Sequence, residues 1–200
     1  MLLISTKNPS KIAEFADWLS RANIPFKTLN DFPDIADVEE TGATFEENAK
    51  LKAKAYFDAT GLPALADDGG IVIDALGGLP GVKSKRWIHG DRESSDEELV
   101  AHTLKMLEDV PDEKRTARFT STIALYDGDN YVCEVGSVEG SIARQCAPYS
   151  KGAPYWGLLF IRQFGKMYGA LSEEEHEAVN HRRIALEKLR GVLIEKYGKV

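Results

Sequence analysis

Apolar residues recur along the first part of the chain with the spacing of a strand followed by a helix. The branched apolar run at residues 1–5 predicts a buried first strand, which ends at the polar loop TKNPSK. A helix is expected next, beginning near Pro9 or Ser10. Its apolar face consists of Ile12, Phe15, Ala16 and Leu19.

The pattern then repeats with a second strand and a second helix. Residues 25–30 fit a strand, and residues 44–60 fit a helix that Thr44 caps with Glu47 at the third helical position, a capping box. Residues 64–75 form another apolar run, which we expect Asp67–Gly70 to interrupt.

In the second half of the chain, the spacing of apolar residues changes from a helical period to a strand period and back. Residues 94–109 predict an acidic-capped amphipathic helix, with Leu99, Thr103, Met106 and Leu107 near one face. Period-two segments at 119–126 and 131–140, separated by DGDN, predict a hairpin, and residues 180–198 predict a closing helix. The order of α/β units, hairpin and closing helices predicts an α/β fold.

Composition narrows the class of protein. With 200 residues and 43% hydrophobic residues, the chain can bury one core or two closely joined lobes. The N-terminal segment MLLISTKNPSK is too polar for a signal peptide or a membrane span, so cytoplasm is the expected compartment. Cys133 and Cys146 lack the spacing of a zinc or redox site and are expected to be packing residues.

The net charge of −7 argues against a nucleic-acid polymer as partner, because binding a phosphate backbone requires a basic face. A small phosphorylated ligand remains possible. A few lysines converging in one cleft can hold a triphosphate beside a divalent cation, whatever the net charge is.

Four polar clusters fall at expected loops or helix ends. The first contains Thr6, Asn8 and Lys11, where helix amides and a lysine could hold phosphate oxygens. An ordinary capped turn would also explain this composition.

The second cluster is EETGATFEENAKLKAK. Ion pairs on a solvated helix face account for Glu47, Lys50 and Lys54. Glu40 lies before the helix, where such pairing does not apply, and is therefore a candidate metal ligand.

The third cluster begins at Asp67 and Asp68. We expect one or both carboxylates at the end of a strand, where a hard cation such as Mg²⁺ would relieve their repulsion. Gly69 and Gly70 would then allow the backbone to approach a ligand closely. An acidic Asp-Gly turn is the alternative.

The fourth cluster opens the last helix with Asn180, His181 and Arg182, and His176 lies one turn earlier. A histidine and an arginine side by side could contact a base edge or a phosphate, although a surface or capping role would also fit.

Together, and in this order, the clusters resemble the pyrophosphatases of non-standard purine nucleoside triphosphates, the inosine triphosphatase family. STKNPSK resembles the family's Thr-x-Asn-x-x-Lys loop, and EETGATFEENAKLKA resembles its Thr-Gly-x-Thr-Phe-x-Glu-Asn-Ala segment. ADDGGIVIDALGGLPGVKSKR resembles Asp-Asp-Ser-Gly-Leu followed by Gly-Gly-x-Pro-Gly-Val, GSVEGSI resembles a family strand, and NHRRIAL resembles its Ser-His-Arg helix start. The resemblance covers nearly the whole chain.

The resemblance implies an elongated mixed α/β sheet in a single domain of two lobes with a central cleft, and a homodimer. The implied reaction splits ITP, dITP or XTP between the α and β phosphates with Mg²⁺, giving a monophosphate and pyrophosphate. Thr6, Asn8, Lys11 and Lys52 would hold the triphosphate, Glu40 and Asp68 would engage the metal, and Asp68 would orient or deprotonate water with support from Asp67. The implied substrate contacts also include Gly69, Arg86, Trp156, His176, His181 and Arg182.

Four departures fall on the implied substrate-recognition positions. Gly69 and Asn180 replace serines, His176 replaces a lysine, and Gly157 replaces the aspartate of a glycine-aromatic loop in which Trp156 retains the stacking ring. We therefore expect a relaxed or shifted base preference. The alternatives are the same chemistry on another modified or pyrimidine nucleotide, and a nucleotide-binding protein without turnover.

Overall fold

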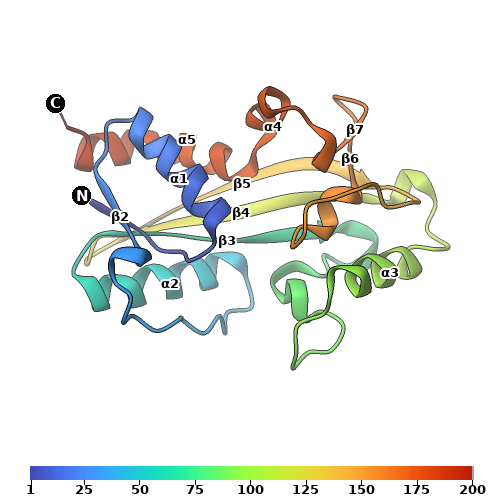
Figure 1. Cartoon of the computed structure of the whole chain (residues 1–200), viewed down its shortest axis with the longest axis horizontal. Coiled ribbons are helices and arrows are strands. Elements are labelled where there is room, and N and C mark those ends of the chain that lie inside the picture. Colours follow the sequence, from blue (N-terminus) through green and yellow to red (C-terminus); the bar gives the residue numbers. More distant parts are fainter. Residues whose placement is uncertain (200) are drawn as a thin grey trace. The chain divides into compact units, whose positions relative to one another are not determined.

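The computed structural model describes residues 1–199 as a mixed α/β fold with a seven-stranded sheet in the order β2-β1-β3-β4-β5-β6-β7 (Figure 1). β1 pairs in parallel with β2 and β3, whereas β6 pairs antiparallel with β5 and β7. The strands are β1 (Leu2–Ile4), β2 (Phe26–Thr28), β3 (Ala64–Ile73), β4 (Thr116–Tyr126), β5 (Tyr131–Ile142), β6 (Leu159–Ile161) and β7 (Lys166–Met167). The α-helices are α1 (Pro9–Arg21), α2 (Phe45–Thr60), α3 (Asp96–Met106), α4 (Glu173–Val179) and α5 (His181–Tyr197). The predicted α/β class is confirmed.

The chain divides into two compact units. The first unit contains residues 1–68, 121–136 and the described chain from 181 onward, and the second contains residues 69–120 and 137–180. The boundary therefore falls within β3, β4 and β5. A cleft between two lobes stays a prediction.

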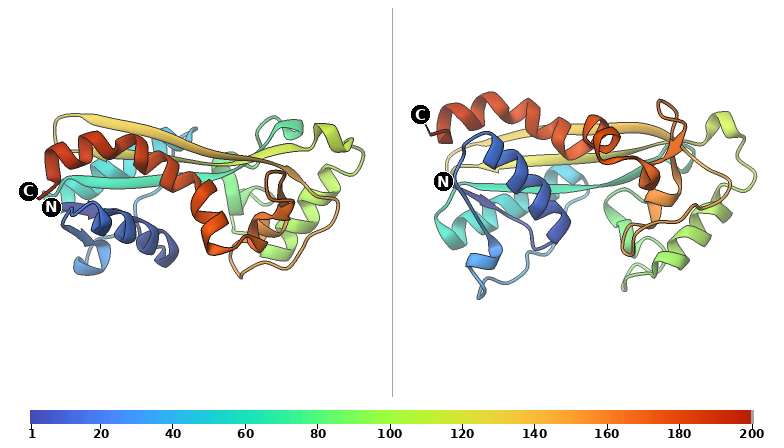
Figure 2. Two further views of the ribbon diagram at one scale, coloured as in Figure 1. Left: turned by 90° about the horizontal axis from the view of Figure 1, so that it is seen from above. Right: turned by 45° about the horizontal axis from the view of Figure 1, so that its top comes forward.

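In the first unit, helices cover both faces of the sheet: α1 and α5 lie on one face and α2 lies on the other (Figures 1 and 2). Leu65 on β3 packs into the core formed with α1 and α5, whereas the next residue, Ala66, packs against Ala49 and Ala53 of α2. This alternation follows from the two-residue period of a strand. It fixes the side of the sheet on which each following residue of β3 lies.

The second unit has its own apolar core, which includes Leu107 directly after α3 and against which Val100 and Leu104 of α3 pack. Leu99 of α3 is also buried. The predicted face of α3 is correct for Leu99, Thr103 and Leu107, but Met106 is 48% exposed and that assignment is wrong. The buried stripe follows every fourth residue, and Met106 lies at its edge. The buried guanidinium of Arg115 donates hydrogen bonds to the carbonyl oxygens of Leu107, Ile142 and Ala143, which secures the end of α3.

The expected interruption of the apolar run at Asp67–Gly70 is wrong, because β3 continues through these residues. Asp67 and Asp68 therefore lie within a ten-residue strand and not at its end. Both are buried, and the strand tolerates them because hydrogen bonds and ion pairs neutralise each carboxylate. Within residues 1–199, no helix has the length and apolar character needed to cross a bilayer.

Candidate active site

Asp67 and Asp68 lie on opposite faces of β3. Asp67 follows Leu65 by two residues and shares its side of the sheet, where α1 and α5 pack, while Asp68 follows Ala66 and faces α2. Their partners agree with this, since Asp67 pairs with α1 and α5 and Asp68 pairs with α2. Strand geometry therefore separates the two carboxylates without requiring a cation between them.

Asp67 is a fully buried anion held by two cations. Its Oδ2 lies 2.6 Å from Lys11 Nζ and 3.2 Å from Arg182 Nε, and the Ser121 hydroxyl donates a hydrogen bond to Oδ1. Burial alone would raise the pKa of Asp67, but the charges of Lys11 and Arg182 outweigh it and hold that pKa well below its usual range. Arg182 Nη1 also lies 3.2 Å from Glu14 Oε1 on α1.

The start of α1 brings together the three residues of the first predicted cluster. The Asn8 side chain accepts hydrogen bonds from the backbone N–H groups of Ser10 and Lys11, and the Thr6 hydroxyl accepts one from the Asn8 N–H. The capped-turn interpretation is therefore correct in detail, and it orients Lys11 toward Asp67.

Asp68 lies in a second set of charges on the α2 side. Lys52 Nζ lies 3.3 Å from Asp68 Oδ1 and 2.6 Å from Glu40 Oε1, and Asn48 Nδ2 donates to Asp68 Oδ2 at 3.1 Å. Burial raises the pKa of Asp68; Lys52 opposes this shift and Glu40 adds to it. Burial would lower the pKa of Lys52, but the charges of Asp68 and Glu40 raise it overall.

The loop that carries Glu40 is fixed onto the first turn of α2. The Gly42 N–H donates to Asn48 Oδ1 at 2.7 Å, and Glu47 accepts from the N–H groups of Ala43 and Thr44 as part of the predicted capping box. A Cβ at Gly42 would lie 2.7 Å from Asn48 Oδ1, so this close approach requires glycine.

Glu40 and Asp68 fit a magnesium ion that takes its remaining ligands from elsewhere. Both carboxylates contact the Lys52 ammonium group, so their oxygens lie close together beside it. Within residues 1–199, no group of three or more acidic, histidine or cysteine side chains is placed to hold a metal. Mg²⁺ is commonly bound by one or two carboxylates together with waters and substrate phosphates, so this donor set suits it.

The second unit contains the other predicted substrate residues. Trp156 and His176 pack together with ring centroids 5.3 Å apart, and Tyr168 contacts both rings. Gly69 lies in β3, and Arg86 is exposed at the end of a 3₁₀ segment, Gly81–Arg86.

Gly157 has no room for a side chain. A Cβ there would lie 2.3 Å from the Ala147 carbonyl oxygen and 2.8 Å from Cys146 Sγ. The family aspartate therefore could not be restored at this position without moving the backbone.

The last predicted cluster lies where α4 and α5 meet along the chain. Asn180 ends α4 and His181 begins α5, and both side chains are buried. The predicted helix start is confirmed, and it places Arg182 in the first turn of α5, where it reaches Asp67.

The first unit thus gathers Lys11, Arg182, Lys52 and Glu40 around Asp67 and Asp68, with Thr6 and Asn8 ordering the turn that carries Lys11. The charge of Lys11 also lowers the pKa of Asp68, so the two sets of charges interact across β3.

Three contributing residues were not predicted from the sequence. Asn48 lies four residues before Lys52, so helical spacing could have placed both on one face of α2. Glu14 lies three residues after Lys11 on α1, which is a similar signal. Ser121 reaches Asp67 from another strand, and no local pattern indicates that contact.

Comparison with known proteins places this geometry in context. Residues 2–192 match the model of the Ham1 family. The dITP/XTP pyrophosphatase of Symbiobacterium thermophilum is 43% identical over 187 residues, which cover 92% of this chain and 90% of that protein. The dITP/XTP pyrophosphatase of Geobacter sulfurreducens is 43% identical over 192 residues, which cover 94% of each chain.

Solved structures show the same fold. A HAM1 protein from Coxiella burnetii superimposes with a TM-score of 0.86 at 36% identity, covering 97% of this chain and 98% of that one. A nucleoside-triphosphatase / dITP/XTP pyrophosphatase from Mycobacterium abscessus gives a TM-score of 0.77 at 38% identity, covering 94% and 96%.

Proposed function

Because the chain belongs to the Ham1 family, we propose that it is a Mg²⁺-dependent nucleoside triphosphate pyrophosphatase acting on non-standard purine nucleotides. It hydrolyses the bond between the α and β phosphates and releases a nucleoside monophosphate and pyrophosphate. The relatives' activity toward dITP and XTP supports this substrate class. The observation that carries the proposal is the convergence of Asp68 and Glu40 on Lys52.

Asp68 orients the attacking water and accepts its proton as the new phosphorus–oxygen bond forms and the bond to pyrophosphate breaks. Burial raises its pKa, which makes the carboxylate a better proton acceptor than an exposed aspartate. Ion pairs with Glu40 and Asp68 hold Lys52 beside Asp68. The charge of Lys52 offsets the negative charge that accumulates on the phosphates.

Lys11, together with Thr6 and Asn8, contributes the second phosphate-binding group at the start of α1. Asp67 holds Lys11 and Arg182 side by side, so these cations are ordered before substrate arrives. Glu40 and Asp68 would hold a Mg²⁺ ion, which would supply positive charge to neutralise the phosphates.

Pyrophosphate release from dITP and XTP with Mg²⁺ tests the proposal. Asp68→Asn should lower the rate about 10²- to 10⁴-fold, because it removes the proton acceptor, while keeping part of the nucleotide affinity. Chelation of Mg²⁺ with EDTA should abolish release. Asp58→Asn is the matched control, since Asp58 is an exposed carboxylate that pairs with Lys54 on α2.

Two outcomes would contradict the assignment. Nucleotide binding by the wild type without release of pyrophosphate would identify a nucleotide-binding protein instead of an enzyme. Full activity of Asp68→Asn would show that another group accepts the proton.

The same panel, extended to ITP, ATP, GTP and pyrimidine triphosphates, tests base preference. We expect the preference for dITP and XTP over ATP and GTP to be relaxed by about tenfold to a hundredfold, because an unmet buried polar group costs about 1–3 kcal/mol. The tight packing at Gly157 supports this, since no side chain at that position can contact the base. An undiminished preference for dITP, ITP and XTP would refute the shift.

The family resemblance further supports a homodimer. The net charge of −7 supports a small nucleotide rather than a nucleic-acid polymer as partner. Sedimentation equilibrium on the full chain would establish the oligomeric state.

A further inference from the structure

In the second unit, the carboxylate of Glu98 in the first turn of α3 holds the preceding segment of the chain. Glu98 Oε1 lies 3.1 Å from His89 Nε2 and 3.3 Å from Arg92 Nη2. Glu98 Oε2 accepts a hydrogen bond from the Ser95 N–H at 2.7 Å, which is one half of a capping box. The Glu98 side chain therefore links His89, Arg92 and Ser95 to the first turn of α3.

The segment is closed into a loop by backbone and ring contacts. The Ser94 N–H donates to the Lys85 carbonyl oxygen at 2.8 Å, so residues 85–94 form a loop whose ends meet. Trp87 packs edge-on against His102 of α3, with ring centroids 4.7 Å apart. Arg86 lies in this loop and is exposed.

The backbone just before the loop is strained. Ser84 has φ 35° and ψ −107°, a conformation that residues other than glycine rarely adopt. Such strain persists only where the surrounding structure imposes it. The backbone bond from Ser94 to Lys85, the residue after Ser84, closes the loop at this point.

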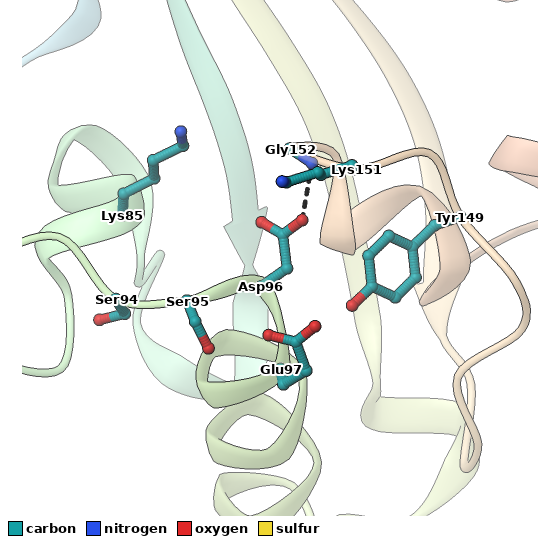
Figure 3. Close-up of a pocket in the computed structure, with 8 residues that line it drawn as sticks. All are labelled: Lys85, Ser94, Ser95, Asp96, Glu97, Tyr149, Lys151 and Gly152. Atoms are coloured by element: carbon teal, nitrogen blue, oxygen red, sulfur yellow. Dashed lines mark hydrogen bonds between the residues drawn. The ribbon is translucent and has the colours of Figure 1, made fainter.

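The loop also forms one side of a pocket of about 590 Å³ in this unit. Figure 3 shows Lys85, Ser94 and Ser95 on one side of the pocket and Tyr149, Lys151 and Gly152 on the other. The opposite side is attached to the same helical turn, because the Gly152 N–H donates to Asp96 Oδ2 at 2.6 Å. The first turn of α3 thus anchors both sides.

We propose that Glu98 is a positioning residue for nucleotide binding: by holding His89 and Arg92, it fixes the loop of residues 85–94 and keeps Arg86 placed for substrate. The inference rests on the proposed function and on the substrate contact that the family resemblance implies for Arg86. Glu98 acts through the loop and does not touch the substrate itself.

Kinetics of pyrophosphate release by the full-length protein test this role. Glu98→Gln preserves the capping bond to Ser95, because glutamine also fits a capping box, but it removes the charge that holds Arg92. We expect KM for dITP to rise about 3- to 10-fold with kcat within about twofold of the wild type, since an unrestrained loop must be ordered on binding. Glu98→Ala, which removes all three contacts, should raise KM further.

Glu113→Gln is the control, because it makes the same change on an exposed carboxylate of the second unit that lies outside both this loop and α3. Its KM should equal that of the wild type. A purely structural role for Glu98 would lower the folded fraction and hence kcat, leaving KM unchanged.

Hydrogen exchange of the ligand-free protein provides a readout that does not need activity. Amides of residues 86–93 should exchange faster in Glu98→Gln than in Glu113→Gln. Wild-type KM for both Glu98 variants, or unaltered exchange in this loop, would overturn the proposal while the wild type remained active. Absence of pyrophosphate release by the wild type would instead overturn the proposed function, and the positioning role with it.

Discussion

Two adjacent aspartates in β3 acquire different properties because successive residues of a strand face different environments. Asp67 faces Lys11 and Arg182 and remains ionised, so its charge stabilises the fold. Asp68 faces α2, where burial and the charge of Glu40 disfavour its ionised form. Asp68, which we propose as the proton acceptor, is therefore the aspartate whose negative charge the fold stabilises less.

Because the fold stabilises the charge of Asp67 more than that of Asp68, replacing each with asparagine should affect the free energy of unfolding differently. Asp67→Asn should lower the free energy of unfolding at pH 7 by about 3–5 kcal/mol, because it leaves two cations beside a buried neutral group. Asp68→Asn should leave that free energy unchanged or raise it, because it removes a charge that folding disfavours.

Urea denaturation of both variants at pH 7 measures these effects. Equal losses of stability in the two variants would contradict the separation of their roles. Asp68→Asn should also be the variant that is folded but inactive.

At the scale of elements, the close packing of α5 on β5 places Arg182. A Cβ at Gly136 of β5 would lie 1.9 Å from the His181 carbonyl oxygen and 2.7 Å from the Ala185 backbone nitrogen. Glycine therefore allows the first turn of α5 to approach the strand, and that turn brings Arg182 to Asp67.

A pair of glycine substitutions tests this contact. Gly136→Ala should lower the free energy of unfolding by about 1–3 kcal/mol and reduce pyrophosphate release, because the added methyl displaces the start of α5. Gly191→Ala lies within α5, where a Cβ would meet nothing within 4 Å, and should raise stability by about 0.5–1 kcal/mol. Thermal unfolding and the release assay distinguish the two. A neutral Gly136→Ala would show that α5 can shift without cost.

Local signals along the sequence predicted the helices well. Thr44 with Glu47 does form a capping box, and Asn8 caps α1 at the predicted boundary, because capping depends on residues only two or three positions apart. The interruption of β3 was wrong for the complementary reason. Local propensity disfavours two aspartates in a strand, but Lys11, Arg182, Lys52 and Asn48 arrive from three helices and neutralise them.

At the scale of the whole molecule, carboxylates that are more acidic in the folded state make the free energy of unfolding depend on pH. Asp127, in the hairpin between β4 and β5, accepts hydrogen bonds from Lys196 of α5 and from the Asn130 and Asp129 backbone. These contacts lower the pKa of Asp127 to about 2. Because this value lies below that of about 3.9 in an unfolded chain, the contribution is complete above about pH 5 and is lost as the pH falls through about 2.

Asp127→Asn should therefore destabilise the protein by about 1 kcal/mol at pH 7, and the difference from wild type should shrink to nearly zero at pH 2. Urea denaturation across this pH range measures it. The neighbouring Asp129→Asn, an exposed residue of the same turn, serves as control and should change stability little. A difference between Asp127→Asn and wild type that is independent of pH would contradict the assignment.

The sequence by itself determined the α/β class, the positions of α1, α2, α3 and α5, and the family resemblance, whereas α4 was not predicted. These follow from periodicity, capping and ordered motifs, which involve residues close together in the chain. Only the tertiary structure decided that Asp67 and Asp68 belong to opposite faces of β3, that Ser121 donates to Asp67, that Glu14 pairs with Arg182, and that Glu98 holds the loop with Arg86. Each of these depends on which distant residue lies nearest in space, and a side chain's charge and orientation are set by that neighbour.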